Sequence, residues 1–216
     1  MSRIVIFANG IITDAPRLRA YLRPDDLIIC ADGGTRHAHQ MGLIPHIIVG
    51  DLDSLEPELA SHMEQAGVEI QRHSPHKDQT DLELALQLAV SKEPREIMLM
   101  GALGGRLDQM LGNIMLLTRP EYVGIRLTVV EANQTAILLR NHDSLTLQGQ
   151  IGDTLSLIPL TATVTNVTLQ GVAWPLINAT LTLGSTWTIS NQFIAPVATV
   201  QIGEGLLLVV HLTLNV

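Results

Sequence analysis

The α/β character of this chain rests on the stretch Ile47-Ile48-Val49-Gly50-Asp51-Leu52-Asp53-Ser54. Its β-branched start predicts a buried strand, and its polar end predicts a loop. A stretch of the same build, Leu27-Ile28-Ile29-Cys30-Ala31-Asp32-Gly33-Gly34, precedes it. Apolar runs that alternate with helical segments are typical of a parallel sheet covered by helices. The N-terminal half is therefore predicted to be an open parallel α/β domain of the Rossmann-like kind.

Five strands are expected in this half, at residues 3–7, 27–31, 47–49, 68–72 and 96–100, with helices between them. Ser54 can cap a helix that runs to Ala66 and stops at Gly67, where glycine readily takes the left-handed conformation. Thr80 and Glu83 have capping-box spacing before a further helix. Four methionines are expected to fill the core, namely Met98, Met100, Met110 and Met115.

The second half of the chain has a different composition. From about Arg126 onward charge becomes scarce, and Thr, Leu, Val and Ile dominate. Short stretches such as residues 153–159, 162–169 and 206–214 predict strands of an antiparallel sandwich or barrel. The boundary is placed near Ala132, just before or after a strand at residues 127–131. Two domains follow, at residues 1–132 and 133–216.

The net charge of −8 excludes a broad basic surface, so neither a nucleic acid nor an anionic membrane is expected as a partner. No run approaches the roughly 18 apolar residues of a membrane span. The single cysteine, Cys30, fits a reducing compartment, and a cytoplasmic location is expected. A polyanionic ligand is then best held through a divalent cation, because acidic side chains bind Mg²⁺ and the metal binds phosphate oxygens.

Acidic clusters follow the predicted strands, and in an open α/β sheet ligands bind outside the carboxyl ends of the strands. Asp51 and Asp53 are two residues apart in an extended or turning segment. Both carboxylates can therefore approach one hard cation from one side, which makes them the first-choice metal ligands. An isolated Asp-x-Asp is more often a loop that caps the next helix and binds water.

The segment Lys77-Asp78-Gln79-Thr80-Asp81 ends at a helix start. Capping by Thr80 and the helix dipole account for part of it. They leave Lys77 and two aspartates three residues apart unexplained. In a functional interpretation Asp78 or Asp81 completes the metal shell, while Lys77 and the free helix-start N–H groups face phosphate. This segment alone leaves both interpretations open.

A third segment, Met100-Gly101-Ala102-Leu103-Gly104-Gly105-Arg106-Leu107-Asp108-Gln109, also follows a strand. Its glycines let backbone N–H groups approach an anion, and Arg106 offers a fork that matches phosphate oxygens. It has neither the Walker A ending nor the dinucleotide Gly-x-Gly-x-x-Gly spacing. Metal-binding acids, two glycine-rich loops and an arginine on one sheet edge together indicate transfer of a phosphorus group.

Four motifs in this order and spacing resemble the thiamine pyrophosphokinase family: Ala31-Asp32-Gly33-Gly34, Gly50-Asp51-Leu52-Asp53-Ser54, Asp78-Gln79-Thr80-Asp81 and Gly104-Gly105-Arg106-Leu107-Asp108. In the second half Gly171-Val172-Ala173-Trp174-Pro175-Leu176 and Ser190-Asn191 look like that family's thiamine-binding segments. The resemblance implies an ATP-binding α/β domain, a thiamine-binding β-sandwich that also dimerises, and a homodimer with each active site between two subunits. The implied reaction transfers diphosphate from ATP to the hydroxyl of thiamine and releases AMP.

The resemblance also implies roles for individual residues. Asp51, Asp53 and Asp81 correspond to Mg²⁺-binding acids, and Arg106 and Asp108 to residues at the transferred phosphates. Trp174 corresponds to the aromatic plate under thiamine, with Gln109, Ser190 and Asn191 also at thiamine and the last two supplied by the partner subunit. The implied ATP-binding residues are Asp32, Gly33, Gly34, Gly50, Lys77, Asp78, Gln79, Thr80, Gly104, Gly105 and Arg106.

Three residues depart from the family's pattern on the thiamine side. Gln192 stands where bacterial relatives commonly have Glu, Thr188 where a glycine is common, and Trp187 is unexpected there. They bear on the identity of the acceptor more than on the use of ATP. Two alternatives remain open: a metal-dependent phosphatase or nucleotide-sugar transferase that uses the Asp-x-Asp pair, and a non-catalytic sensor of thiamine diphosphate or nucleotide.

Overall fold

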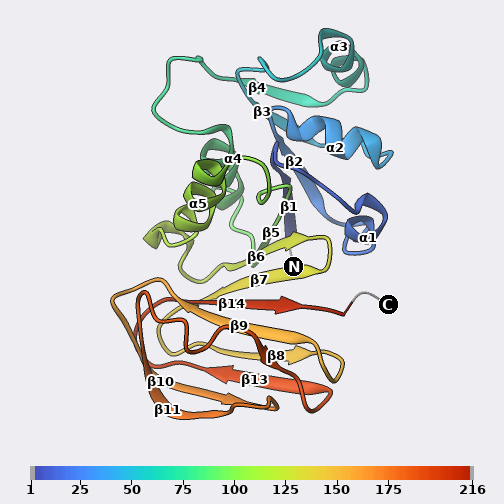
Figure 1. Cartoon of the computed structure of the whole chain (residues 1–216). Helices are drawn as coiled ribbons and strands as arrows, with labels where there is room; N and C mark the ends of the chain where they lie inside the picture. Colours follow the sequence, from blue (N-terminus) through green and yellow to red (C-terminus); the bar gives the residue numbers. More distant parts are fainter. Residues whose placement is uncertain (1–2, 215–216) are drawn as a thin grey trace. The chain divides into compact units, whose positions relative to one another are not determined.

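The chain divides into two compact units, Met1–Ala132 (unit 1) and Asn133–Val216 (unit 2). The computed structural model describes residues 3–214, so the first two and last two residues of the predicted domains lie outside the described part. It shows a mixed α/β protein, with a parallel sheet in unit 1 and antiparallel sheets in unit 2 (Figure 1).

Parallel strands form the sheet of unit 1. Their order is β6 (Arg126–Glu131), β5 (Glu96–Met100), β1 (Arg3–Phe7), β2 (Leu27–Ala31), β3 (Ile47–Gly50) and β4 (Glu69–Arg72). The strands predicted at 3–7, 27–31 and 96–100 are confirmed, whereas β3 extends to Gly50 and β4 begins one residue later than predicted. The chain winds outward from β1 to β4 and then returns to β5 on the other side of β1, which creates a topological switch point.

Helices connect these strands: α1 (Ala15–Arg19), α2 (Gly34–Gln40), α3 (Pro57–Gln65), α4 (Asp81–Val90) and α5 (Leu107–Leu116), followed by the short 3-10 helix η1 (Pro120–Tyr122). Leu18, Ala38 and Met63 pack into one core cluster with Val5 and Cys30 of the sheet. Helix α4 packs on β1, β2 and β3, and it lies across the sheet from α2 in Figure 1. Within residues 3–214 no helix has the length and apolarity needed to cross a bilayer.

The two predicted helix starts have different outcomes. Thr80 is an N-cap as predicted, because its Oγ1 accepts a 3.2 Å hydrogen bond from the N–H of Glu83. The prediction that Ser54 caps α3 is wrong: the N-cap is Glu56, and the Ser54 hydroxyl donates to Asp53 Oδ1 at 2.9 Å. Pro57 sets the later start, since proline is favoured in the first helical turn. Gly67 follows the end of α3 with φ +82°, as predicted.

Unit 2 contains two antiparallel sheets. One has the order β12 (Asn191–Gln192), β9 (Thr154–Pro159), β14 (Leu207–Leu212) and β7 (Gln134–Leu139). The other has the order β11 (Leu176–Thr182), β10 (Thr163–Gln170), β13 (Val197–Gln201) and β8 (Ser144–Gln148). One buried cluster takes Leu157 and Val209 from the first sheet and Val164 and Val200 from the second. The antiparallel character predicted for this half is therefore confirmed.

Buried Asp153 joins the turn before β9 to the end of the described chain. Its Oδ1 accepts a 2.8 Å hydrogen bond from the N–H of Leu214, and its Oδ2 accepts one of 2.9 Å from Gln150. Oδ2 also lies 2.9 Å from Nε2 of His211. Burial raises the pKa of Asp153, but these donors outweigh burial and hold the pKa below its usual range.

This lowered pKa makes a pH prediction. A carboxyl with a lowered folded-state pKa stabilises the fold above its unfolded pKa of about 3.9, and that contribution is lost as the pH falls through the folded value. Asp153→Asn is expected to cost about 1–3 kcal/mol at pH 7, because buried donors lose their charged acceptor, but to lose less stability than the wild type on acidification. Thermal unfolding followed by circular dichroism at pH 7 and below pH 4 checks this. Equal losses in both proteins would contradict it.

Candidate functional site

A cavity of about 610 Å³ opens in unit 1, lined by segments that follow β1, β2, β3 and β5 and by the starts of α4 and α5. This is the carboxyl edge of the sheet, at the switch point between β1 and β5, where ligands bind in open α/β sheets. Most predicted site residues of unit 1 line it: Asp32, Asp51, Lys77, Gln79, Thr80, Asp81, Gly104, Gly105, Arg106 and Gln109.

Three aspartates converge in this region. Asp32, Asp51 and Asp53 each offer a carboxylate oxygen, and these oxygens lie within 4.8 Å of one another. Asp32 is buried, and its Oδ1 has no hydrogen-bond partner among the described residues. Burial raises the pKa of Asp32, and the nearby charges of Asp81 and Asp53 add to the increase. A buried carboxylate oxygen without a donor, beside two further carboxylates, is a donor set that fits a hard divalent cation such as Mg²⁺.

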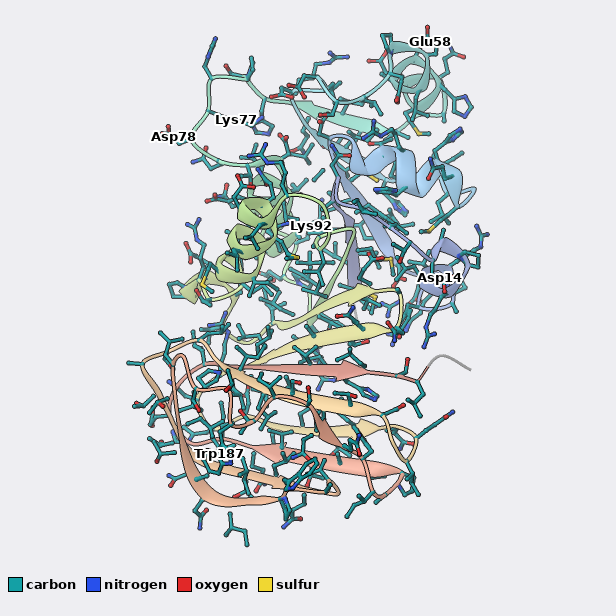
Figure 2. The ribbon with its side chains drawn as sticks, in the orientation of Figure 1. Asp14, Glu58, Lys77, Asp78, Lys92 and Trp187 are labelled. Carbon is teal, nitrogen blue, oxygen red and sulfur yellow. The ribbon has the colours of Figure 1, made fainter. Side chains whose placement is uncertain are left out.

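Lys77 joins the acids from the other side. It lies on the loop between β4 and α4, where Figure 2 labels it beside Asp78. Its Nζ is 3.2 Å from Asp51 Oδ2 and 2.8 Å from Asp81 Oδ1. The contact with Asp81 is an ion pair without the angles of a hydrogen bond. The structure thus groups Asp32 with Asp51 and Asp53, while Asp81, the third predicted metal ligand, is held by Lys77.

The pKa values of Lys77 and Asp51 reflect this contact. Burial lowers the pKa of Lys77, but Asp81 and Asp51 outweigh burial and hold the pKa above its usual value. Burial likewise raises the pKa of Asp51, and the N–H of Asp53 together with Lys77 outweighs it, so that the pKa is lowered. Both groups are therefore charged near neutral pH, and the site carries a formed ion pair.

Several predicted ATP-binding residues do not line the cavity. A Cβ at Gly34 would collide with the carbonyl of Phe7, and one at Gly33 with the side chain of Asn9. A Cβ at Gly50 would lie 2.9 Å from Asp32 Cβ and 3.1 Å from Asp81 Oδ1. These three glycines therefore allow close packing behind the site. Asp53, Asp78 and Asp108 are exposed and also lie outside the lining.

Arg106 and Asp108 form a two-pronged ion pair at the start of α5. Nε of Arg106 donates to Asp108 Oδ1 at 3.1 Å, and Nη2 donates to Oδ2 at 2.6 Å. Both side chains are exposed. The Arg106 guanidinium holds the pKa of Asp108 below its usual range. Arg106 therefore has the geometry that binds two oxygens of an anion, and here Asp108 supplies them.

The lining also contains residues that were not predicted from the sequence, among them Asn9, Ile11 and Asn113. Asn9 Oδ1 accepts a 2.7 Å hydrogen bond from Arg36, and Asn113 donates to the carbonyl of Ala102 at 2.7 Å. The segment Ala8-Asn9-Gly10 follows the first strand directly. Its position at a strand end was the available signal, but it carries no charged side chain.

In unit 2 the predicted thiamine residues form one local arrangement. The ring of Trp174 is 62% exposed. Asn191 is buried and holds the Trp174 backbone, since its Oδ1 accepts from the Trp174 N–H at 3.1 Å and its Nδ2 donates to the Trp174 carbonyl at 2.7 Å. Ser190 has φ +62°, and its N–H donates to Ser156 Oγ at 3.0 Å. The side chain of Asn191 is thus placed to position Trp174.

The three departures from the family's pattern lie in the same region. Thr188 is buried, and its hydroxyl donates to the carbonyl of Leu157 at 2.6 Å. Trp187, labelled in Figure 2, is 63% exposed. Gln192 lies on β12 and pairs with Thr154 of β9. Thr188 therefore has a structural partner, whereas Trp187 presents a second aromatic surface to solvent.

Comparisons with known proteins agree along the chain. The family model described as "Thiamin pyrophosphokinase, catalytic domain" matches residues 18–129, and "Thiamin pyrophosphokinase, vitamin B1 binding domain" matches residues 143–207. Thiamine pyrophosphokinase of Bacillus subtilis (strain 168) is 32% identical over 213 residues, which is 99% of this chain and 100% of the relative. The crystal structure of thiamine pyrophosphokinase from Bacillus subtilis matches with a TM-score of 0.88 at 30% identity, over 99% of this chain and 100% of that one. The structure of thiamin pyrophosphokinase from Geobacillus thermodenitrificans gives 0.84 at 30% identity, over 99% and 98%.

Proposed function

This chain belongs to the thiamine pyrophosphokinase family and transfers diphosphate from ATP to the hydroxyl of thiamine; from that premise we propose that it works with Mg²⁺ bound at the acidic edge of the unit 1 sheet. The observation that supports this most is the convergence of Asp32, Asp51 and Asp53 around the unpartnered Asp32 Oδ1. Asp81, held 2.8 Å from Lys77, is a further ligand. Bound Mg²⁺ would neutralise phosphate charge and make the β-phosphorus more electrophilic.

The remaining residues of the cavity orient the nucleotide. Gly104 and Gly105 have φ values of +80° and +79°, which free their N–H groups to approach phosphate oxygens. Arg106 exchanges Asp108 for phosphate oxygens and stabilises the charge that develops during transfer. Asp108, released by Arg106, orients the thiamine hydroxyl for attack. AMP then leaves, and thiamine diphosphate is the product.

Unit 2 supplies the thiamine side in this proposal. Its two antiparallel sheets share a core, which supports the proposed β-sandwich. Trp174 offers its exposed side chain as the plate for the thiamine rings. Asn191 fixes the backbone of Trp174 and so sets the direction of the ring. Ser190 and Gln109 contact thiamine. The partner subunit supplies Ser190 and Asn191, and therefore also the Trp174 whose backbone that Asn191 binds, while Gln109 comes from the other subunit. A cytoplasmic location is part of this proposal, supported by the single cysteine, Cys30, which is buried and free.

A homodimer is the proposed assembly. The supporting observation is helix α5, none of whose residues is buried. Leu107, Leu111 and Met115 recur every four residues and are exposed, which makes an apolar stripe. Met115, expected in the core, is in fact 49% exposed, and Met110 is only partly buried. Light scattering should give a mass twice that of one chain, and a mass equal to one chain would contradict the dimer.

An AMP-release assay with ATP and Mg²⁺, run with and without thiamine, tests the function. Thiamine-dependent AMP, together with a thiamine diphosphate mass, is the expected result. Nucleotide cleavage at the same rate with and without thiamine, together with a trapped phospho-aspartate, would favour the phosphatase alternative. Binding of both ligands without any AMP release would favour the sensor.

Replacing Trp174 by alanine is expected to raise the KM for thiamine about tenfold, because an aromatic stacking partner contributes roughly 1–1.5 kcal/mol. The KM for ATP should be unchanged. Trp187→Ala is the matched control, since its ring is equally exposed, 63% against 62%. Steady-state kinetics with both substrates measures the difference. If only Trp187→Ala raised the KM for thiamine, the stacking role would belong to Trp187.

A further inference from the structure

Lys77 makes a contact that its expected role at phosphate does not explain. Its ammonium sits between two carboxylates of the proposed metal site, 3.2 Å from Asp51 Oδ2 and 2.8 Å from Asp81 Oδ1. We propose that Lys77 is a built-in counter-cation, which competes with the divalent metal for Asp51 and Asp81 and so sets the metal affinity of the nucleotide-free protein. This inference rests on the proposed magnesium site and deepens it.

The burial of the three groups shows that this contact belongs to the site. The exposed fractions are 13% for the Lys77 side chain, 14% for Asp51 and 27% for Asp81. Surface ion pairs between long, solvated side chains are worth little. Here the lysine ammonium lies between Asp51, which follows β3, and Asp81, which begins α4. The contact therefore neutralises charge within the site.

The negative charge of the site explains why a lysine is favourable at this position. Asp32, Asp51, Asp53 and Asp81 lie close together, and the charges of Asp53 and Asp81 act on Asp32. Like charges at these distances repel one another unless a cation is present. Lys77 relieves part of this repulsion with one positive charge. A divalent cation relieves more of it, but while the ammonium stays in place it also repels the incoming metal.

The position of Lys77 gives it a second partner once it is released. Lys77 lines the cavity with Gln79 and Thr80, on the side of the loop that leads to α4. An ammonium freed from Asp51 and Asp81 thus remains in the cavity proposed for the triphosphate, and lysine binds phosphate well as a point charge. Metal binding is expected to release Lys77 from the aspartates, and the free ammonium can then bind the nucleotide. Metal and ATP should therefore bind cooperatively.

Titration of the nucleotide-free protein with Mn²⁺, followed by electron paramagnetic resonance of the free ion, tests the competition. Lys77→Met should bind Mn²⁺ about 30-fold more tightly, which is the factor expected in a water-like dielectric when a unit positive charge roughly 4 Å from a divalent cation is removed. Lys92→Met is the matched control, because it loses the same charge beyond the far end of α4 and should bind as the wild type does. Equal or weaker Mn²⁺ binding by Lys77→Met would overturn the proposal.

A second measurement uses the wild-type chain, whose lysines are Lys77 and Lys92 alone. Acylation by an amine-reactive reagent, quantified by peptide mass, gives the ratio of modification at the two sites. Saturating Mg²⁺ without nucleotide should raise the Lys77 to Lys92 ratio severalfold, because the ammonium leaves its carboxylates. An unchanged ratio would overturn the proposal even if Lys77→Met failed to fold.

These measurements distinguish the counter-cation role of Lys77 from the enzymatic function. The wild type could make thiamine diphosphate although Lys77→Met leaves Mn²⁺ affinity unchanged and Mg²⁺ leaves the acylation ratio unchanged. In that case the counter-cation role is wrong and the enzymatic function stands. If the wild type neither binds Mn²⁺ nor releases AMP with thiamine, the proposed metal site itself is wrong.

Discussion

Asp51→Asn is expected to lower kcat/KM for thiamine by about 10³-fold or more, because metal stabilisation of developing charge is worth several kcal/mol. Asp51 is the aspartate that belongs both to the three-carboxylate cluster and to the Lys77 ion pair. Asparagine keeps the shape of the side chain but removes the charge that binds a cation. The thiamine-dependent AMP assay at saturating ATP measures the loss, and Mn²⁺ affinity should fall with it.

Asp25→Asn is the control for this prediction, since Asp25 is an exposed aspartate outside the cavity lining. It should leave both the rate and Mn²⁺ affinity unchanged. Asp51→Asn with wild-type kcat/KM would remove the metal role from this residue. The same measurements on Asp32→Asn and Asp81→Asn compare these two proposed ligands, because the variant that binds Mn²⁺ more weakly has lost the more important one.

Arg106→Ala is expected to reduce kcat by about 10²–10³-fold, the loss typical of removing one preorganised donor from a site of charge development. The structure supplies the reason, because Arg106 lines the cavity and its fork already grips two carboxylate oxygens of Asp108. Arg106→Lys should recover only part of the rate, since an ammonium lacks the two-pronged geometry. Single-turnover measurement of AMP formation separates this step from substrate binding.

Arg126→Ala is the matched control for Arg106→Ala. Arg126 is exposed at the first residue of β6, the end of the strand opposite the carboxyl edge, and its loss should leave kcat unchanged. A defect of Arg106→Ala confined to the KM for thiamine would contradict a role at the phosphates. It would instead assign Arg106 to the acceptor side.

The strands of the parallel sheet could be predicted from the sequence because their signal is local. Val5, Ile29 and Ile48 lie in short apolar runs that end at polar residues, and a fully buried parallel strand needs little else. Ligands in open α/β sheets bind at the carboxyl ends of the strands, and this rule predicted that Asp51 and the Arg106 loop lie at the same edge of the sheet. Thr80 was equally accessible, because a cap depends on residues three positions apart.

Contacts between distant segments could not be predicted from local patterns. Asp32 was expected only as an ATP contact, yet it shares the acidic cluster with Asp51 and Asp53, because β2 and β3 are neighbours in register. Asn9 joined the lining because β1 lies beside β5 at the switch point. Helix α3 begins after Glu56 rather than after Ser54, because Pro57 is favoured in the first helical turn. The Ser54 hydroxyl donates to the adjacent Asp53 instead.

The type of chemistry could therefore be predicted from local sequence motifs, since the identities and order of the acids, glycines and arginine already indicate phosphorus-group transfer. How these charges are shared depends on the fold. Lys77 is 26 residues from Asp51, and no local pattern brings an ammonium to that carboxylate. Register and loop path set their separation, and Coulomb interactions depend on that separation and on burial. Which aspartates face each other and which one holds Lys77 were settled only when the strands had paired.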